Sequence, residues 1–422
     1  MSGSQSGIFK LKGVIKTYDW GGKEFLSELL SQPNPEKQPM AEYWLGAHGI
    51  DSSIIFSEAK KIRLNLFVAA EREAILGKTI AKKFGGLPYL LKLLDVADML
   101  SIQVHPAKHE AEIEFARENK ERIPLDSPQR NYRDDNHKPE FLVALNEFWL
   151  LHGFKPVAQL RTTLEAIPEL KQLLDIFNST GYDQLYKTAM EMPQETVNQV
   201  LQPLLGRIIP LYRNGQLRKD DESFWAARAA LTFNREPSSS GLPTTDSQAL
   251  VMDRGIFSIY FFNLLHLKKD EGVFQDAGIP HSYLEGQGVE IMANSDNVLR
   301  GGLTRKHVDV KELMKHVKFE ETIPRIVRPQ RINEQEELYR TAAPDFKLSR
   351  FKLKKSDTAS FESATAEILL VTRGNVSINS PPEQLEIKRG EAVFIIAHQH
   401  ISLRASEDAD VYRASVPVHS SE

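Results

Sequence analysis

The chain has 422 residues, which is long enough for two or three domains, and it contains no cysteine. Its 53 lysines and arginines nearly balance 57 aspartates and glutamates, giving a net charge of -4. This balance argues against nucleic-acid or anionic-membrane partners, and the apolar runs are too short to span a bilayer. Residues 1–7 show no secretory signal, and the lack of cysteine fits the reducing cytoplasm, so we expect a cytoplasmic protein.

The first 155 residues mostly show the alternation of apolar and polar side chains that is typical of strands. Strands are expected at 8–20, 41–49 and 141–145, two apolar strands separated by a short break at 87–104, and helices at 62–82 and 106–121. Residues 156–235 then repeat apolar side chains every three or four positions, which indicates a helical block that interrupts the strands. A Ser/Pro/Gly-rich loop at 237–246 follows it.

Strands return at 260–267, and a short helix is expected at 306–316. From residue 329 onward, short strands and glycine turns recur at the even spacing of a jelly-roll barrel, and residues 263–284 share this rhythm. We therefore predict a mainly β fold with inserted α: two jelly-roll β-barrels, with a helical domain inserted in the first. The expected division is 1–155 and 251–325 for the first barrel, 156–250 for the insertion and 326–422 for the second barrel.

Nitrogen and oxygen ligands lie beside predicted strands at three separate places. Gln103 and His105 are two residues apart, so a strand would direct both to one face. His137 with Glu140, and His281 after a proline, are the other two places. A single histidine is more often structural, but three such places together favour a metal site made of nitrogen and oxygen ligands, which suits zinc.

A second cluster is cationic and rich in glycine, and it contains Arg300, Arg305 and Lys306. Glycine lets a backbone approach a ligand closely, and arginine with lysine commonly binds phosphate. The cluster is therefore either an anion site or a charged surface turn. Trp20 lies beside two glycines in a turn, so it either lines a pocket or belongs to the core.

Several motifs, in the same order along the chain, resemble those of the type I phosphomannose isomerase family of the cupin superfamily. They are Y-D-W-G at 18–21, A-E-Y-W-L-G-A-H at 41–48, L-P-Y-L-L-K at 87–92, S-I-Q-V-H-P at 101–106, H-K-P-E-F at 137–141, G-F-K-P at 153–156, I-P-H-S-Y-L at 279–284 and M-A-N-S-D-N-V-L-R-G-G-L-T at 292–304. The sequence departs from the family's usual pattern at 150–152 and at Arg305.

This resemblance implies two cupin barrels and one Zn²⁺ per chain. It implies that Gln103, His105, Glu140 and His281 bind zinc, that Arg300 serves catalysis, and that Ser101 and Lys306 hold the phosphate of the substrate. Lys92, Lys138, Tyr283, Glu290 and Asp296 match other active-site positions of the family, and we expect Lys92 to bind the substrate and the other four to serve catalysis. From the sequence itself we add His137 as a candidate catalytic residue and Trp20 as a candidate substrate-binding residue. The implied protein is a monomeric enzyme of carbohydrate metabolism and GDP-mannose biosynthesis that binds a small sugar phosphate.

The implied reaction interconverts mannose 6-phosphate and fructose 6-phosphate through an enediol. It needs a base for the C2 proton, and the candidates are Glu290, Asp296, His137, Lys138 or a hydroxide on the metal. We favour Lys138, His137 and Asp296. Two alternatives stay open: a metal-dependent cupin oxygenase that binds Fe²⁺, and a non-catalytic regulator that binds a sugar phosphate.

Overall fold

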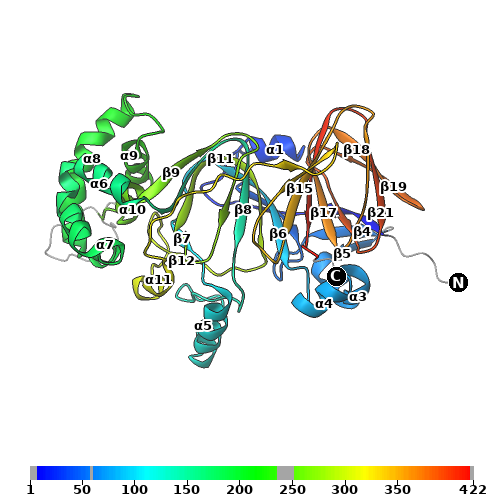
Figure 1. Ribbon diagram of the computed structural model, residues 1–422, viewed down its shortest axis with the longest axis horizontal. Helices are drawn as coiled ribbons and strands as arrows, with labels where there is room; N and C mark the ends of the chain where they lie inside the picture. Colours follow the sequence, from blue (N-terminus) through cyan, green and yellow to red (C-terminus); the bar gives the residue numbers. More distant parts are fainter. Residues whose placement is uncertain (1–6, 58–59, 235–250, 419–422) are drawn as a thin grey trace.

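The structure is a computed structural model that describes residues 7–57, 60–234 and 251–418. Within these ranges it combines helices with two nine-stranded sheets and one four-stranded sheet (Figure 1). The loop expected at 237–246 lies outside the described residues. None of the helices in the described ranges has both the length and the apolar character needed to cross a membrane.

The central sheet occupies the middle of the molecule and has the strand order β10-β8-β11-β6-β3-β2, with β7, β9 and β12 attached (Figure 1). Its strands are β2 (Val14–Lys16), β3 (Glu42–Gly46), β6 (Tyr89–Val96), β7 (Gln103–Val104), β8 (Glu140–Phe154), β9 (Phe262–Leu267), β10 (Gly272–Gln275), β11 (His281–Ala293) and β12 (Leu299–Arg300).

Two long antiparallel strands, β8 and β11, form the middle of this sheet. Their pairing includes irregularities around Gly286, whose φ is 140°. A Cβ at this position would lie 2.6 Å from the carbonyl oxygen of Glu147, so only glycine permits the close approach of the two strands. On the other side of β11, every residue of β6 is buried, which explains its nearly continuous apolar sequence.

The helices predicted from the three-and-four spacing lie between β8 and β9, two strands that pair with each other. They are α6 (Val157–Glu165), the 3₁₀ helix η1 (Pro168–Leu170), α7 (Lys171–Glu191), α8 (Gln194–Arg213) and α9 (Glu222–Phe233). With α10 (Gly255–Phe261) they form the group at one end of the molecule in Figure 1. The strand expected at 260–267 therefore begins two residues later, at Phe262.

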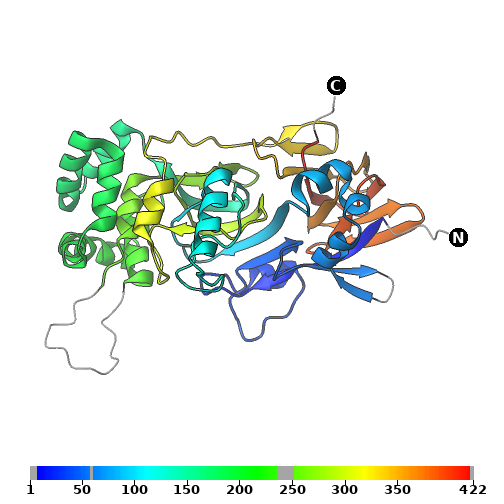
Figure 2. The same ribbon diagram turned by 90° about the horizontal axis from the view of Figure 1, so that it is seen from below.

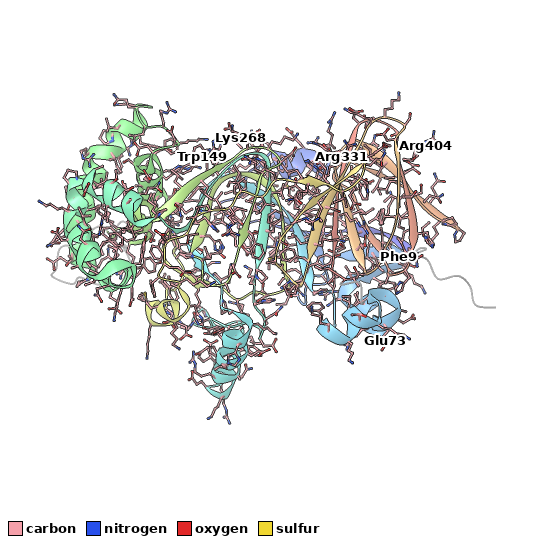
Figure 3. All side chains as sticks on the ribbon, viewed as in Figure 1. Phe9, Glu73, Trp149, Lys268, Arg331 and Arg404 are labelled. Carbon is pink, nitrogen blue, oxygen red and sulfur yellow. The ribbon has the colours of Figure 1, made fainter. Side chains whose placement is uncertain are left out.

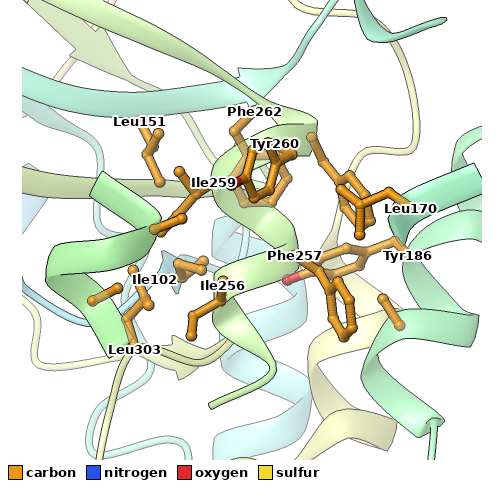
Figure 4. Close-up of a cluster of buried hydrophobic side chains, with 14 of the residues drawn as sticks. Ile102, Leu151, Leu170, Tyr186, Ile256, Phe257, Ile259, Tyr260, Phe262 and Leu303 are labelled. Atoms are coloured by element: carbon orange, nitrogen blue, oxygen red, sulfur yellow. The ribbon is translucent and has the colours of Figure 1, made fainter. Parts of the chain in front are cut away.

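A large apolar cluster joins these helices to the central sheet. In Figure 4, Phe257 and Ile256 of α10 lie near Tyr186 of α7 and near Ile102, the residue before β7. All four side chains are fully buried. Apolar side chains of the helices thus pack against Ile102 and fix the position of the segment that contains Gln103.

The second nine-stranded sheet mixes strands from both ends of the chain, because β1 pairs with β20 and β4. Its strands are β1 (Ile8–Lys12), β4 (Ile54–Ser57), β5 (Lys60–Arg63), β13 (Gln330–Arg331), β14 (Glu336–Tyr339), β15 (Lys347–Leu353), β17 (Glu367–Arg373), β20 (Ala392–Ile395) and β22 (Ala409–Ser415). The four-stranded sheet contains β16 (Thr358–Glu362), β18 (Asn375–Ser380), β19 (Glu383–Lys388) and β21 (His400–Ala405).

Figure 2 shows the N-terminal strands, in dark blue, beside the C-terminal strands, in orange. Figure 3 places Phe9 of β1 at this end of the molecule and Trp149 of β8 at the helical end, where its ring lies 5.9 Å from that of Trp225. The remaining helices are α1 (Phe25–Leu29), α2 (Leu64–Ala70), α3 (Arg72–Leu76), α4 (Lys78–Phe84), α5 (Lys108–Lys120) and α11 (Val310–His316).

The fold is therefore a mixture of sheets and helices, with strands and helices near most of the expected positions. Each sheet of the described residues runs between different end strands and does not close on itself. The division into barrels and an inserted domain stays a prediction.

Candidate functional site

Three buried side chains from distant parts of the chain meet in the central sheet. His105 follows β7, Glu140 begins β8 and His281 begins β11. The Nε2 atom of His105 lies 3.3 Å from one carboxylate oxygen of Glu140, and that of His281 lies 3.3 Å from the other. The antiparallel pairing of β11 with both β7 and β8 brings these positions together.

Backbone carbonyls fix how the two imidazoles present their nitrogens. The Nδ1 atom of His105 lies 2.8 Å from the carbonyl oxygen of Asn297, and that of His281 lies 2.9 Å from that of Ile279. With Nδ1–H donating in each case, both Nε2 atoms present lone pairs toward Glu140. The Nε2 atom of His105 is buried and has no hydrogen-bond partner.

Two nitrogen lone pairs and a carboxylate therefore face one another within 4.8 Å. Lone pairs and a carboxylate repel one another in a buried space, and a cation between them would relieve this repulsion. Histidine nitrogens and a carboxylate oxygen are ligands that zinc prefers, so these residues fit a zinc ion.

The protonation states of the group also suit metal binding. Burial would raise the pKa of Glu140, but the charge of Lys138, whose Nζ lies 3.1 Å away, and the contact with His105 hold that pKa well below its ordinary value. Burial, together with the charge of Lys138, lowers the pKa of His105 to about 4. The imidazole is therefore neutral near pH 7, as a metal ligand must be.

Gln103 lies next to this group in the sheet. It is in register with His281 on one side and with Arg300 of β12 on the other. The strand β7 is shorter than the sequence predicted, because it holds only Gln103 and Val104. Ser101 is half-buried and lies just before the strand, outside the two residues that form it.

A row of buried charges crosses the neighbouring strands. Lys92 of β6 places its Nζ 3.0 Å from Glu290 of β11 and 3.5 Å from Glu42 of β3. The hydroxyl of Tyr283 donates to the other oxygen of Glu290 at 2.8 Å. Burial lowers the pKa of Lys92, but the two carboxylates outweigh burial and raise it. Burial raises the pKa of Glu290, against the effect of Lys92.

Asp296 lies at the other side of this row, 3.0 Å from the Nε2 atom of His48. Burial would raise the pKa of Asp296, but the hydrogen bond and charge of His48 outweigh it and lower that pKa. No role was predicted for His48 or Glu42 from the sequence. Part of their signal was present, because Glu42 and Trp44 fall on alternate positions of one strand, which directs both to one face, whereas His48 follows the end of that strand at Gly46.

Two predicted site residues, His137 and Trp20, have their observed contacts away from His105, Glu140 and His281, which we call the metal-type group. The Nε2 atom of His137 lies 2.9 Å from a carboxylate oxygen of Asp345, which comes from the C-terminal part of the chain. Trp20 is half-buried, stacks on Tyr18 at 5.7 Å between ring centroids, and packs against the end of β6.

The cationic cluster divides into two parts. A side-chain nitrogen of Arg305 lies 3.4 Å from the carbonyl oxygen of Thr232 in α9, so Arg305 is directed toward the helices. Arg300 and Lys306 have no carboxylate partner within the described part of the chain. Burial lowers the pKa of Arg300, and the charge of Arg133 lowers it further. Arg133 is a cation that the sequence analysis did not identify.

The chain was then compared with known proteins. A family model for the catalytic domain of type I phosphomannose isomerase matches residues 8–157. Mannose-6-phosphate isomerase of Escherichia coli K12 is 34% identical over 396 residues, which cover 92% of this chain and 95% of the relative. The human mannose-6-phosphate isomerase is 33% identical, with 96% and 98% coverage.

Solved structures agree with these sequence relatives. Mannose 6-phosphate isomerase from Salmonella typhimurium, bound to fructose 6-phosphate and zinc, has a TM-score of 0.85 and 31% identity. The match covers 98% of this chain and 100% of that chain. Because similarity in sequence and in structure extends over nearly the whole length, the chain belongs to the type I phosphomannose isomerase family.

Proposed function

We propose that this protein is a zinc-dependent isomerase that interconverts mannose 6-phosphate and fructose 6-phosphate. The observation that carries the proposal is the buried group of His105, Glu140 and His281, whose nitrogen lone pairs face one carboxylate at 3.3 Å. Relatives named mannose-6-phosphate isomerase match nearly the full chain, and one related structure holds zinc together with fructose 6-phosphate.

His105, Glu140 and His281 would hold one Zn²⁺ per chain, with Gln103 as the fourth ligand. The register of Gln103 opposite His281 supports this role. When bound, zinc would act as a Lewis acid that stabilises negative charge on the sugar oxygens. One carboxylate among three neutral ligands would leave the site with a net charge of about +1, which favours an anionic enediolate over a neutral sugar.

The chain's own residues must move a proton between C2 and C1 of the sugar. Lys138 and Asp296 are proposed to do so, with His137 beside Lys138 in sequence. Asp296 has a lowered pKa and is therefore ionised near pH 7, as a proton acceptor must be, whereas the raised pKa of Glu290 suits a group that holds a proton. Tyr283 would fix the orientation of Glu290 through its 2.8 Å hydrogen bond.

Other residues would bind and orient the substrate. Arg300 would add a positive charge beside the reacting oxygens, since it is in register with Gln103. Lys306 and Ser101 are proposed to hold the phosphate, and the lack of a carboxylate partner for Lys306 in the described residues supports this. Lys92 and Trp20 would complete the sugar pocket.

The proposed architecture is a cupin barrel formed by residues 1–155 and 251–325, with a helical domain at 156–250 inserted in it. A second cupin-like jelly roll at 326–422 would follow. Pairing of β8 with β9 across the intervening helices supports an insertion. Pairing of β1 with β20 indicates that the N-terminal strands would also contribute to the second barrel. We further propose a cytoplasmic monomer that supplies GDP-mannose biosynthesis, as the cysteine-free sequence allows.

A coupled assay on mannose 6-phosphate tests the function directly. Activity should disappear with a chelator and return with Zn²⁺, and Glu140→Ala or His281→Ala should abolish it. Arg300→Ala should keep zinc bound and lose turnover. Oxygen consumption by an iron-loaded protein would support an oxygenase instead, and substrate binding without turnover by the zinc-loaded protein would support a regulator.

A further inference from the structure

Three cationic side chains at one end of the site lack acidic partners. They are Arg133, Arg300 and Lys306, and in the described ranges no carboxylate forms an ion pair with any of them. Most other buried or half-buried cations near the site are paired, as Lys92 and Lys138 show. Unpaired cations that lie close together repel one another, so other contacts of the fold must hold these three residues in place.

The backbone of Arg133 is held in place by a buried asparagine. The side-chain oxygen of Asn297 accepts from the N–H of Arg133 at 2.7 Å and from that of Asp134 at 3.3 Å. Its amide nitrogen donates to the carbonyl oxygen of Asp134 at 2.8 Å and to that of Asn136 at 2.9 Å. Asn297 lies three residues before Arg300, so these bonds fix the loop of Arg133 next to the strand of Arg300.

The same asparagine also contacts the metal-type group, because its carbonyl oxygen accepts from His105 at 2.8 Å. Arg133 is therefore placed by the residue that orients a proposed zinc ligand. Its own side chain is exposed and forms no hydrogen bond or ion pair with another side chain of the described residues. The guanidinium is thus free to meet a ligand that enters from solvent.

Electrostatic coupling agrees with this placement. Burial lowers the pKa of Lys306, and the charges of Arg300 and Arg133 lower it further. Burial followed by the charge of Arg133 has the same effect on Arg300. Arg305 does not contribute, which fits its contact with Thr232. Both effects require the positive charges of Arg133, Arg300 and Lys306 to lie near one another.

We propose that Arg133 is a further substrate-binding residue, which joins Lys306 in binding the phosphate group of the sugar, next to the positive charge of Arg300. This inference rests on the proposed function, since it takes the substrate to be a phosphate monoester. A planar guanidinium can bind two phosphate oxygens at once, and a dianion would relieve the mutual repulsion of the three cations. Arg133 thus contributes to affinity for phosphorylated sugars and takes no part in proton transfer.

The test uses the zinc-loaded full chain and compares Arg133→Gln with the matched control Arg325→Gln. Arg325 is also exposed, and its side chain forms no hydrogen bond or ion pair among the described residues. The backbone N–H of residue 133 remains, so its bond to Asn297 persists in the variant. Steady-state kinetics give KM and kcat for mannose 6-phosphate, inhibition by inorganic phosphate gives a Ki, and metal analysis gives zinc per chain.

Arg133→Gln should raise both KM and the Ki of inorganic phosphate by about tenfold, the equivalent of about 1.4 kcal/mol. Its kcat and zinc content should match those of wild type and of Arg325→Gln, and Arg133→Lys should recover part of the affinity. Unchanged KM and Ki would overturn the inference, as would a higher KM with an unchanged phosphate Ki. Loss of zinc in Arg133→Gln would show a structural role instead.

The proposed function can fail separately from this inference. If zinc-loaded wild type does not isomerise mannose 6-phosphate, the proposed function is wrong. Inorganic phosphate binding measured by calorimetry would then still show whether Arg133 belongs to an anion site, because that measurement needs no turnover. If wild type is active and the two glutamine variants behave alike, only the inference about Arg133 is wrong.

Discussion

Replacing Lys92 with methionine tests how far the buried row of charges depends on a single cation. The Lys92 ammonium lies 3.0 Å from Glu290 and 3.5 Å from Glu42, and the three side chains are 7%, 3% and 9% exposed. Removing one partner of a buried ion pair leaves uncompensated charge and costs about 3–5 kcal/mol of folding free energy. We expect a loss of this size near pH 8.

The loss should be smaller at low pH. Burial already raises the pKa of Glu290 against the effect of Lys92, so removal of Lys92 should raise that pKa further. A carboxyl whose pKa is higher in the folded than in the unfolded state favours folding at low pH, and this contribution disappears as the pH rises through the folded pKa. Lys92→Met should therefore lose less stability at about pH 5 than at about pH 8.

Urea unfolding of the metal-free protein, followed by tryptophan fluorescence, measures both values. Glu290→Gln and the double variant complete a thermodynamic cycle, in which the double variant should lose less than the sum of the two single variants. Equal losses at both pH values with additive effects would refute the reasoning, because Lys92 would then act through packing and not through charge.

Three further predictions concern the surroundings of the site. Asp345→Asn should lower kcat while zinc stays bound, because the 2.9 Å contact with His137 holds the segment of Lys138, and Asp345→Glu should recover part of the rate. Ile102→Ala should cost about 2–5 kcal/mol in urea unfolding because it opens a cavity in the cluster of Figure 4. The metal-free protein should lose stability as the pH falls from about 6.5 to about 4, because His105 and His152 each have a folded pKa of about 4 and the unfolded chain binds their protons first. His105→Asn should reduce this slope by about one proton, and an unchanged slope would contradict the assignment.

Local patterns in the sequence predicted much of the fold. The apolar run at 87–104 became the buried strand β6 and the short β7, and the three-and-four spacing after residue 156 became the helices α6 to α9. Both patterns are informative because, within one helix or strand, the spacing of the apolar residues follows from which face of that element is buried. Three residues of the metal-type group were found in the same way, since each stands beside an apolar strand.

Long-range contacts were harder to predict. The pairing of β1 with β20 joins the two ends of the chain, and alternation along either strand does not identify its partner. The strand β7 is short because Leu100 donates to Tyr283, whereas Ile102 donates to Gly302. The backbone of this one run therefore forms hydrogen bonds with two different segments. The spacing of apolar residues within the run does not predict this division.

Contacts of charged side chains were the least predictable part of the site. His137 stands beside Lys138 in sequence, yet its partner is Asp345, over two hundred positions away. Arg133 lies in a charged loop that reads as ordinary surface. Its surroundings depend on Asn297, which a sequence alone does not place near residue 133.

One end of the site favours a cation and the other end favours an anion, and this difference determines the orientation in which a substrate can bind. At one end, His105, Glu140 and His281 present two lone pairs and a carboxylate, whose charge Lys138 offsets in part, so this end favours a cation. At the other end, Lys306 has no carboxylate partner among the described residues, so this end favours an anion. A ligand with hydroxyl and carbonyl oxygens at one end and a phosphate at the other satisfies both in a single orientation, with its reacting carbons toward the metal. The reverse orientation would place a dianion beside Glu140 and leave the cations unpaired, so the charges alone favour productive binding of an aldose or ketose 6-phosphate.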